Sequence, residues 1–225
     1  MAVRYYKEAF DRCDEDRKIK ILQTGIDEFS TLGLESANIN VIAKKAGISV
    51  GLLYKYFPTK EAFFLTCVKH ATKTLDDFLK SVAESDDKIL VRAEKLIRAI
   101  QKTSGKNSKY VKLYNEITKV SPKYDISAFA NEVEAHSAKL YTAFIKKCIS
   151  DGDIRRDCDP KLFAFFFDTL LMSLQFSYTC DYHRERLKIY CGEEIFEDEE
   201  KMVRELLKFL ESAFTFEKTD IKKLK

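Results

Sequence analysis

The stretch from Asn38 to Lys60, which reads NINVIAKKAGISVGLLYKYFPTK, most constrains what this chain can fold into. Its first half repeats apolar residues at the i, i+3, i+4 and i+7 spacing of one helix face, at Ile39, Ile42, Ala43 and Ala46. Asn38 is placed to cap the free amides at the start of this helix, and Gly47 is placed to end it in a left-handed conformation. The sequence therefore predicts a short helix that stops at a glycine turn.

A second short helix is predicted directly after the turn, from Val50 to about Tyr56, with Ser49 as its N-cap. Two apolar residues one turn apart, Leu53 and Phe57, are expected to be buried. The residues expected to face outward or toward the flanks are Tyr54, Lys55 and Tyr56. Two short helices joined by a glycine-containing turn form a helix-turn-helix, whose second helix enters the major groove of DNA. A plain helical hairpin with exposed tyrosines is the alternative that spacing alone leaves open.

The string IAKKAGISVGLLYKYFPTKEAF resembles the N-terminal DNA-binding domain of the TetR/AcrR family of bacterial transcriptional regulators. The pattern of that family is approximately I-A-x-x-A-G-V-S-x-G-x-L-Y-x-[HY]-F-x-x-K-E-x-L. The matching positions are Ile42, Ala43, Ala46, Gly47, Ser49, Gly51, Leu53, Tyr54, Tyr56, Phe57, Lys60 and Glu61. Ile48 and Phe63 are conservative departures, and Ala37-Asn38 replaces a threonine pair that often opens the family's second helix. The motif is long and specific, and it covers roughly the first third of the chain.

The resemblance implies a DNA-binding surface on these two helices. Base or near-base contacts are expected from Asn40, Ser49 and Lys55, and phosphate contacts from Tyr54, Tyr56 and Lys60. The other residues of the expected surface are Asn38, Lys44, Val50, Gly51 and Leu52. Because the start of the second helix offers few hydrogen-bond donors, we expect specificity from Lys55, from apolar contact with thymine methyl groups and from DNA shape.

The chain as a whole is predicted to be all-α, with about nine helices. It has 225 residues with only 7 glycines and 3 prolines, and its apolar spacing is helical nearly everywhere. Residues 1–62 are expected to form the three-helix DNA-binding domain, and residues 63–225 a helical ligand-binding and dimerisation domain. The first core helix is expected from Arg17 to Thr31, closed by Gly33, with a core face of Ile19, Leu22, Ile26 and Phe29. Residues 1 to about 14 are expected to be a short lead helix or a mobile arm.

The helix predicted from Thr59 onward carries an apolar stripe that continues well past the DNA-binding domain. The stripe is Phe64, Val68, Ala71, Leu75, Phe78 and Val82. One rigid helix that joins the two domains would convert a shift in the C-terminal domain into a changed position of the DNA-binding helices. An ordinary amphipathic helix is the alternative reading of this stripe.

Two C-terminal helices are predicted to form a dimer interface. Asp159 and Pro160 signal the start of a helix over Lys161 to Tyr182 that is apolar on most sides, and the last helix is expected at about Asp198 to Phe216. Two helices from each of two subunits would form a four-helix, two-fold interface. The residues expected there are Phe166, Leu170, Leu174, Val203, Leu206, Leu210 and Phe214. The alternative is that both helices belong to the core of one chain.

A small-molecule pocket in the C-terminal domain is implied only by the family resemblance. Aromatic side chains at helical spacing are more often core than pocket. TetR-like proteins nevertheless enclose a largely apolar pocket in this part of the chain. The residues expected to line it are Tyr110, Tyr114, Phe129, His136 and Phe167.

Charge, cysteines and motifs exclude several other classes of function. The net charge of +3 and the pI near 8.4 are only mildly basic, so any DNA-binding charge must be local. Six scattered cysteines lack metal-like spacing, no secretory signal opens the chain, and no apolar run of roughly 18 residues appears. Free thiols in the cytoplasm are therefore expected, with redox sensing as a minority reading. We find no catalytic constellation, no metal site and no cofactor motif, and we expect no membrane partner.

The function predicted from the sequence is a homodimeric, sequence-specific DNA-binding repressor. A small hydrophobic or amphipathic effector would release it from a palindromic double-stranded DNA operator. A transcriptional activator of the same fold is one alternative. The other is a helical small-molecule-binding protein or enzyme in which the DNA-binding helices are vestigial, against which Lys55 and Lys60 argue.

Overall fold

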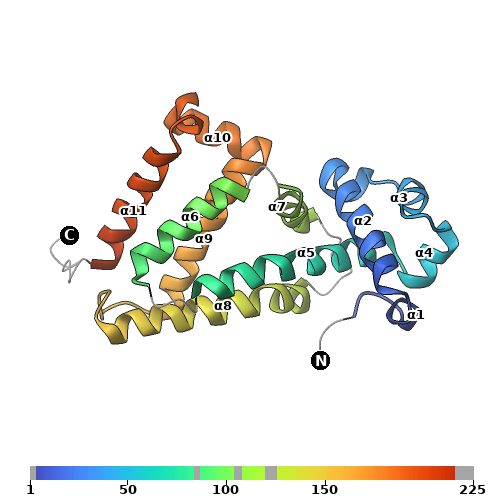
Figure 1. Ribbon diagram of the computed structural model, residues 1–225, viewed down its shortest axis with the longest axis horizontal. Helices are drawn as coiled ribbons and strands as arrows, with labels where there is room; N and C mark the ends of the chain where they lie inside the picture. The colour runs from blue at the N-terminus through green and yellow to red at the C-terminus, as the bar shows by residue number, and fades with distance from the viewer. Residues whose placement is uncertain (1–3, 84–86, 104–107, 120–125, 216–225) are drawn as a thin grey trace. The chain divides into compact units, whose positions relative to one another are not determined.

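The computed structural model describes residues 4–83, 87–103, 108–119 and 126–215 (Figure 1). Within these ranges the regular structure is helical throughout, which confirms the all-α prediction. The chain forms more helices than the nine expected, and their bounds are α1 Glu8–Asp11, α2 Glu15–Ser36, α3 Ile39–Ala46, α4 Val50–Tyr56, α5 Lys60–Ala83, α6 Ile89–Thr103, α7 Ser108–Asn115, η1 Glu116–Lys119, α8 Ile126–Asp151, α9 Pro160–Thr179, α10 Asp181–Cys191, η2 Glu193–Phe196 and α11 Glu199–Thr215. The two η elements are short 3-10 helices.

The helices form two compact units, and α5 and α8 contribute residues to both. Unit 1 contains residues 1–76 and 106–135, and unit 2 contains residues 77–105 and 136–225. This division differs from the predicted boundary after residue 62. The first buried core includes α5 as far as Ala71 and also residues of α7 and α8, because their apolar side chains pack with those of α2. The stripe expected at Leu75, Phe78 and Val82 lies outside the described side chains.

Helix α2 provides the central face of the core of unit 1. The Asp14 carboxylate caps it by accepting from the Arg17 amide at 3.2 Å, and Gly33, at φ +77°, breaks it as predicted. The expected core position Ile19 is 52% exposed, whereas Ile21 is fully buried. The core-facing stripe therefore starts at Ile21, and Ile19 lies on the solvent side of the helix.

Helices α2 and α5 approach closely at Gly25. A Cβ atom at this position would lie 2.4 Å from Cζ of Phe63 and 2.8 Å from Sγ of Cys67. Phe63 is fully buried, and its ring centroid lies 5.5 Å from that of Phe29 and 4.6 Å from that of Phe57. The absence of a side chain at Gly25 thus makes room for the aromatic centre of this unit.

Helix α7 and η1 pack on α2, which explains why they belong to unit 1. Leu113 is fully buried in the core, and the Lys109 ammonium lies 2.8 Å from the Asp27 carboxylate. At the break in α2 the Leu34 amide donates to the Glu116 carboxylate at 3.3 Å. Segments some 82 residues apart in sequence are therefore held together by both apolar and polar contacts.

In unit 2, α6 contacts both α9 and α11, and these helices enclose a second core (Figure 1). Four of the seven residues predicted at a dimer interface are buried in this core within one chain: Leu174, Val203, Leu210 and Phe214. For these four the alternative reading was correct. Leu170 and Leu206 are partly buried, and only Phe166 is exposed.

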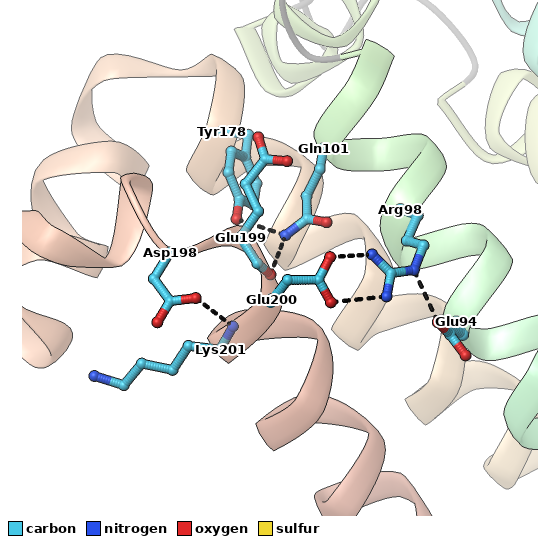
Figure 2. A network of polar contacts seen from close by, with 8 residues as sticks. All are labelled: Glu94, Arg98, Gln101, Tyr178, Asp198, Glu199, Glu200 and Lys201. Atoms are coloured by element: carbon cyan, nitrogen blue, oxygen red, sulfur yellow. Dashed lines mark hydrogen bonds and ion pairs between the residues drawn. The ribbon is translucent and has the colours of Figure 1, made fainter.

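A polar network joins α6 to the first turn of α11 (Figure 2). The Arg98 guanidinium donates to both Glu200 carboxylate oxygens, at 2.5 and 2.9 Å, and to the Glu94 carboxylate at 2.8 Å. The Gln101 amide donates to the Tyr178 hydroxyl at 3.2 Å and to the carbonyl oxygen of Glu199 at 2.9 Å. The bidentate hydrogen bonds between Arg98 and Glu200 fix the orientation of α11 on α6. Because these charges are exposed, the pair contributes little to the stability of the fold.

Helix α9 ends earlier than predicted, and α10 was not foreseen. Cys180 has extended backbone angles, φ −107° and ψ 128°, so the expected helix over 161–182 is divided into α9 and α10. No glycine or proline marks this break, which is why the sequence pattern gave no sign of it. The Asp159 cap and Pro160 at the helix start are confirmed, since the Asp159 carboxylate accepts from the amides of Lys161 and Leu162.

The surface of α9 is strongly apolar. Leu162, Phe165 and Phe166 are 54%, 62% and 55% exposed, and they share one face at the i, i+3 and i+4 spacing. By length and composition α9 could also cross a membrane, with 33% of its most apolar window buried, which corrects the expectation that no apolar run was long enough. One such helix is weak support for a membrane protein, because core helices of other proteins pass the same test.

Candidate nucleic-acid interface

The turn between α3 and α4 has the geometry that the sequence predicted. The Asn38 side chain accepts from the Asn40 amide at 2.9 Å and caps α3. Gly47 ends α3 in the left-handed region, at φ +75° and ψ 31°, and the Ile48 amide donates a hydrogen bond to the Ala43 carbonyl at 3.0 Å. This closed turn sets the angle between the two helices.

Helix α4 has the predicted bounds, from Val50 to Tyr56. The Ser49 hydroxyl accepts from the Leu52 amide at 3.1 Å and so caps its first turn. Leu53 and Phe57 are each 1% exposed and seat α4 on the core, as expected. The buried face fixes which residues α4 presents to solvent.

The outward side of the two helices contains most of the residues predicted to bind DNA. Those with exposed side chains or backbone are Asn38, Asn40, Lys44, Ser49, Gly51, Tyr54 and Lys55, whereas Val50 and Leu52 are half-buried. A Cβ atom at Gly51 would meet nothing within 4 Å among the described residues. Packing inside the chain therefore does not require glycine here, and the position is open to the close approach of another molecule.

Tyr56 does not face outward as predicted. It is 6% exposed, and its ring lies 5.3 Å from that of Phe10. Desolvation raises the pKa of Tyr56, with a hydrogen bond to the Cys13 thiol as the next cause. The helical position of Tyr56 is on the flank of α4, but α1 covers that flank, which a local sequence pattern cannot reveal.

Lys60, which is expected to contact phosphates, also has partners within the chain. Its ammonium donates to the carbonyl oxygens of Glu35 at 2.6 Å and of Ala37 at 3.1 Å. These groups lie at the C-terminal end of α2, where carbonyls lack partners within the helix. Lys60 is the first residue of α5, so these hydrogen bonds join the end of α2 to the start of α5.

Sequence reasoning missed two contacts that position the interface. Glu28, on α2, is only 6% exposed and its carboxylate lies 3.0 Å from the ammonium of Lys45, on α3. Lys7 bonds to the last turn of α4, with its amide 2.8 Å from the Tyr56 carbonyl and its ammonium 3.2 Å from the Tyr54 carbonyl. Both pairs are distant in sequence, so no spacing rule would have found them.

The five residues predicted to line a ligand pocket are divided between the two units. Tyr110, Tyr114 and Phe129 pack in the core of unit 1, where the Tyr114 hydroxyl bonds to the Glu134 carboxylate. Phe167 is 1% exposed in the core of unit 2. His136 has an exposed side chain, which does not fit a lining role.

The described cysteines form no disulfide with one another, and four of them are buried. Burial raises the pKa of Cys67 well above its usual value and the pKa of Cys148 to about 11. Both groups therefore remain protonated at neutral pH and are poorly reactive toward oxidants. Among the described residues no three His, Cys, Asp or Glu side chains are grouped to hold a metal ion.

Comparison with known proteins places this geometry in a family. The family model for bacterial regulatory proteins of the tetR family matches residues 21–67, which include α3 and α4. An uncharacterized HTH-type transcriptional regulator of Bacillus subtilis, YhgD, is 25% identical over 170 residues, covering 72% of this chain and 84% of that protein. The HTH-type transcriptional repressor KstR of Mycolicibacterium smegmatis is 24% identical over 157 residues, covering 70% and 74%.

The fold is also similar to a solved structure. The transcriptional regulator FadR from Bacillus subtilis, in complex with stearoyl-CoA, superposes with a TM-score of 0.65 at 15% identity, covering 84% of this chain and 96% of that one. At this identity the likeness concerns the fold. Taken together, the matched motif, the capped α3–α4 turn and the shared helical fold show that the chain belongs to the TetR family of helix-turn-helix, DNA-binding transcriptional regulators.

Proposed function

We propose that this regulator is a homodimeric repressor that a small hydrophobic or amphipathic effector releases from a palindromic operator. The observation that carries the DNA-binding part is the exposed side of α3 and α4. There, hydroxyl, amide and ammonium groups face outward from two helices whose large apolar side chains are buried. Such a surface donates hydrogen bonds to phosphates and base edges in a major groove.

The homodimer is supported by the exposed apolar face of α9. Leu162, Phe165 and Phe166 would be covered by the same face of a second copy, as in a two-fold helical interface. Asp168 lies near the middle of α9, which spans Pro160–Thr179. Charged groups are costly in the middle of a bilayer, so we assign this face to a subunit contact in the cytoplasm and not to a membrane.

The effector class is supported only by relatives. FadR is described in complex with stearoyl-CoA, an amphipathic ligand, and KstR is described as a repressor. An effector of this kind would lower operator affinity by binding more tightly to the conformation that cannot hold both operator half-sites. Thermal-shift measurements with saturated fatty acids and acyl-CoA thioesters of increasing chain length test this. No stabilisation by any of them would contradict the proposed effector class.

The DNA-binding proposal is tested by selecting duplexes from a random library with the full-length protein. We expect the enriched duplexes to contain two inverted half-sites one helical turn, or a multiple of it, apart. An unselective or undetectable enrichment would contradict the proposal.

Gly51→Ala separates DNA binding from folding. The new methyl group meets no described neighbour and removes a glycine from a helix, so it should stabilise the protein by up to about 1 kcal/mol. We nevertheless expect weaker binding to the selected duplex, because the methyl group would occupy space at the DNA contact. Unchanged affinity, measured by fluorescence anisotropy, would contradict a close approach at this residue.

The roles of individual side chains are tested by comparing Tyr54→Phe with Lys55→Ala. Loss of the Tyr54 hydroxyl should weaken binding about equally on selected and scrambled duplexes, because phosphates are the same in both. Loss of the Lys55 ammonium should weaken mainly the selected duplex, by about 1–3 kcal/mol if it contacts a base. If both variants act alike on both duplexes, this assignment is wrong.

A further inference from the structure

The segment from Tyr5 to Cys13, which we call the brace, contacts the C-terminal end of α4. The Lys7 amide donates to the Tyr56 carbonyl at 2.8 Å, and its ammonium donates to the Tyr54 carbonyl at 3.2 Å. Both carbonyls lie in the last turn of the helix, where they have no intrahelical partner. Helix α4 has only 7 residues, so it depends on such external contacts to stay formed and oriented.

Ring contacts extend the same attachment into the core. Phe10 is 4% exposed, and its ring centroid lies 5.3 Å from that of Tyr56 and 4.7 Å from that of Phe57. Tyr6 packs edge-on against Phe10, with centroids 5.3 Å apart. The brace therefore covers the flank of α4 opposite to the outward-facing Tyr54 and Lys55, and it leaves those two side chains exposed.

The other end of the brace is anchored on α8, within the same unit. Tyr5 is 8% exposed, and its ring lies edge-on to that of Phe129, with centroids 5.6 Å apart. Phe129 is itself 1% exposed. The brace thus connects two fixed points, the first turns of α8 and the last turn of α4. It precedes the region matched by the family model, which begins at residue 21.

We infer that the brace is a working part of the DNA-binding apparatus and that Lys7 is a positioning residue for α4. Lys7 would act by holding the angle and the last turn of α4, and not by contacting DNA. Since α4 presents Tyr54 and Lys55, a loosened last turn would misplace both. The inference rests on the DNA-binding function proposed above.

Lys7→Met tests the inference, because methionine keeps an apolar stem of similar length and removes the ammonium. Lys7→Arg is the conservative variant, and Lys73→Met, an exposed lysine on α5, is the matched control for loss of one charge. Affinity is measured by fluorescence anisotropy on the selected duplex and on a scrambled duplex, at several salt concentrations. Amide hydrogen exchange of α4 is measured on the same full-length proteins without DNA.

We expect Lys7→Met to weaken binding to the selected duplex about tenfold, which corresponds to about 1.4 kcal/mol, with no change on the scrambled duplex or in the salt slope. Exchange at the last turn of α4 should rise. Lys7→Arg and Lys73→Met should behave like the wild type in both measurements. Equal weakening on both duplexes, with a salt slope reduced by about one, would instead mark Lys7 as a direct phosphate contact and overturn the inference.

The two readouts distinguish this inference from the function on which it rests. If the wild-type protein enriched no duplex, the DNA-binding proposal would fail while hydrogen exchange still tested the brace. Unchanged exchange in α4 of Lys7→Met would overturn the positioning role whatever the DNA measurements show.

Discussion

Large aromatic side chains are buried in the core of unit 1, whereas several large apolar side chains are exposed on the helices α9 and α10 of unit 2. In unit 1 the aromatic residues Phe29, Phe57, Phe63 and Phe64 are at most 1% exposed. In α9 and α10 several are largely exposed: Leu162, Phe165, Phe166, Tyr182, Ile189 and Tyr190. A polar outer face above a closed core suits a surface that binds DNA.

The difference shows which part of the chain buries its apolar side chains without a second molecule. The core-facing side chains of α3 and α4, such as Ile42 and Leu53, are buried by other residues of unit 1, so no other molecule is needed to cover them. The exposed apolar face of α9 is an unusual surface for a monomer, which is why we propose a second copy of the chain as its cover. The following changes test this contrast, from the largest expected effect to the smallest.

Replacing a buried aromatic residue of unit 1 should lower the free energy of unfolding far more than replacing an exposed aromatic residue of α9. Phe63→Ala removes a fully buried ring between Phe29 and Phe57, so we expect it to lower the free energy of unfolding by about 3–5 kcal/mol. Phe165→Ala, at a 62% exposed site, should change it by about 0.5 kcal/mol or less when the protein is dilute enough to be monomeric. Urea unfolding followed by circular dichroism measures both. Similar losses for the two variants would break the comparison.

A charge on the exposed face of α9 should break the proposed dimer. Phe166→Glu would place a carboxylate within an apolar contact, so we expect the dimer dissociation constant to rise about 100-fold, or about 2.7 kcal/mol. Val91→Glu, at a 43% exposed apolar position on α6, is the control and should leave association unchanged. Size-exclusion chromatography with light scattering measures both. A wild-type protein that is monomeric at micromolar concentration would contradict the dimer itself.

The same substitution at two helical glycines should have opposite effects. Gly25→Ala would place a methyl group against Phe63 and Cys67, so we expect a loss of about 1–3 kcal/mol in the free energy of unfolding. Gly51→Ala meets no described neighbour and should be neutral or stabilising. Thermal and urea unfolding of the two variants measure this directly. Equal destabilisation would show that the close approach of α2 and α5 is not what requires glycine at position 25.

The smallest expected effect is a dependence of stability on pH through His70. Its pKa is lowered, mainly because half-burial disfavours the charged ring and secondly because of the Lys73 ammonium. The unfolded chain therefore binds a proton more readily, so stability should fall as pH drops through the ordinary value of 6.5 and stop falling once the folded form is also protonated. His70→Gln should flatten this part of the profile, measured by urea unfolding between about pH 7.5 and pH 5.5. An identical slope in the variant would contradict the assignment.

Local sequence signals predicted the α3–α4 region closely. Asn38, Gly47 and Ser49 occupy the caps that their residue types favour, and α4 has the predicted bounds. These features depend on hydrogen bonds within a few residues, which is why spacing and residue type suffice. The same holds for the start of α9 at Asp159 and Pro160.

Predictions failed where a distant segment decides the environment of a residue. Tyr56 has the spacing of an outward residue, but Phe10 covers it. Among the residues expected at the dimer interface, Leu174 and Val203 have the same apolar pattern as Phe166 yet are buried in one chain. An apolar stripe on a helix indicates that this face must be covered, but it does not indicate which segment covers it.

The sequence by itself determined the helical class, the helix-turn-helix and its caps, because these follow from apolar periodicity and from backbone hydrogen bonds to nearby side chains. Only the tertiary structure decided that α7 packs on α2, that α9 and α10 are separate helices, and that Lys7 and Phe10 hold the last turn of α4. Those outcomes depend on contacts between residues far apart in the chain, whose free energies compete with local preferences and leave no periodic trace in the sequence.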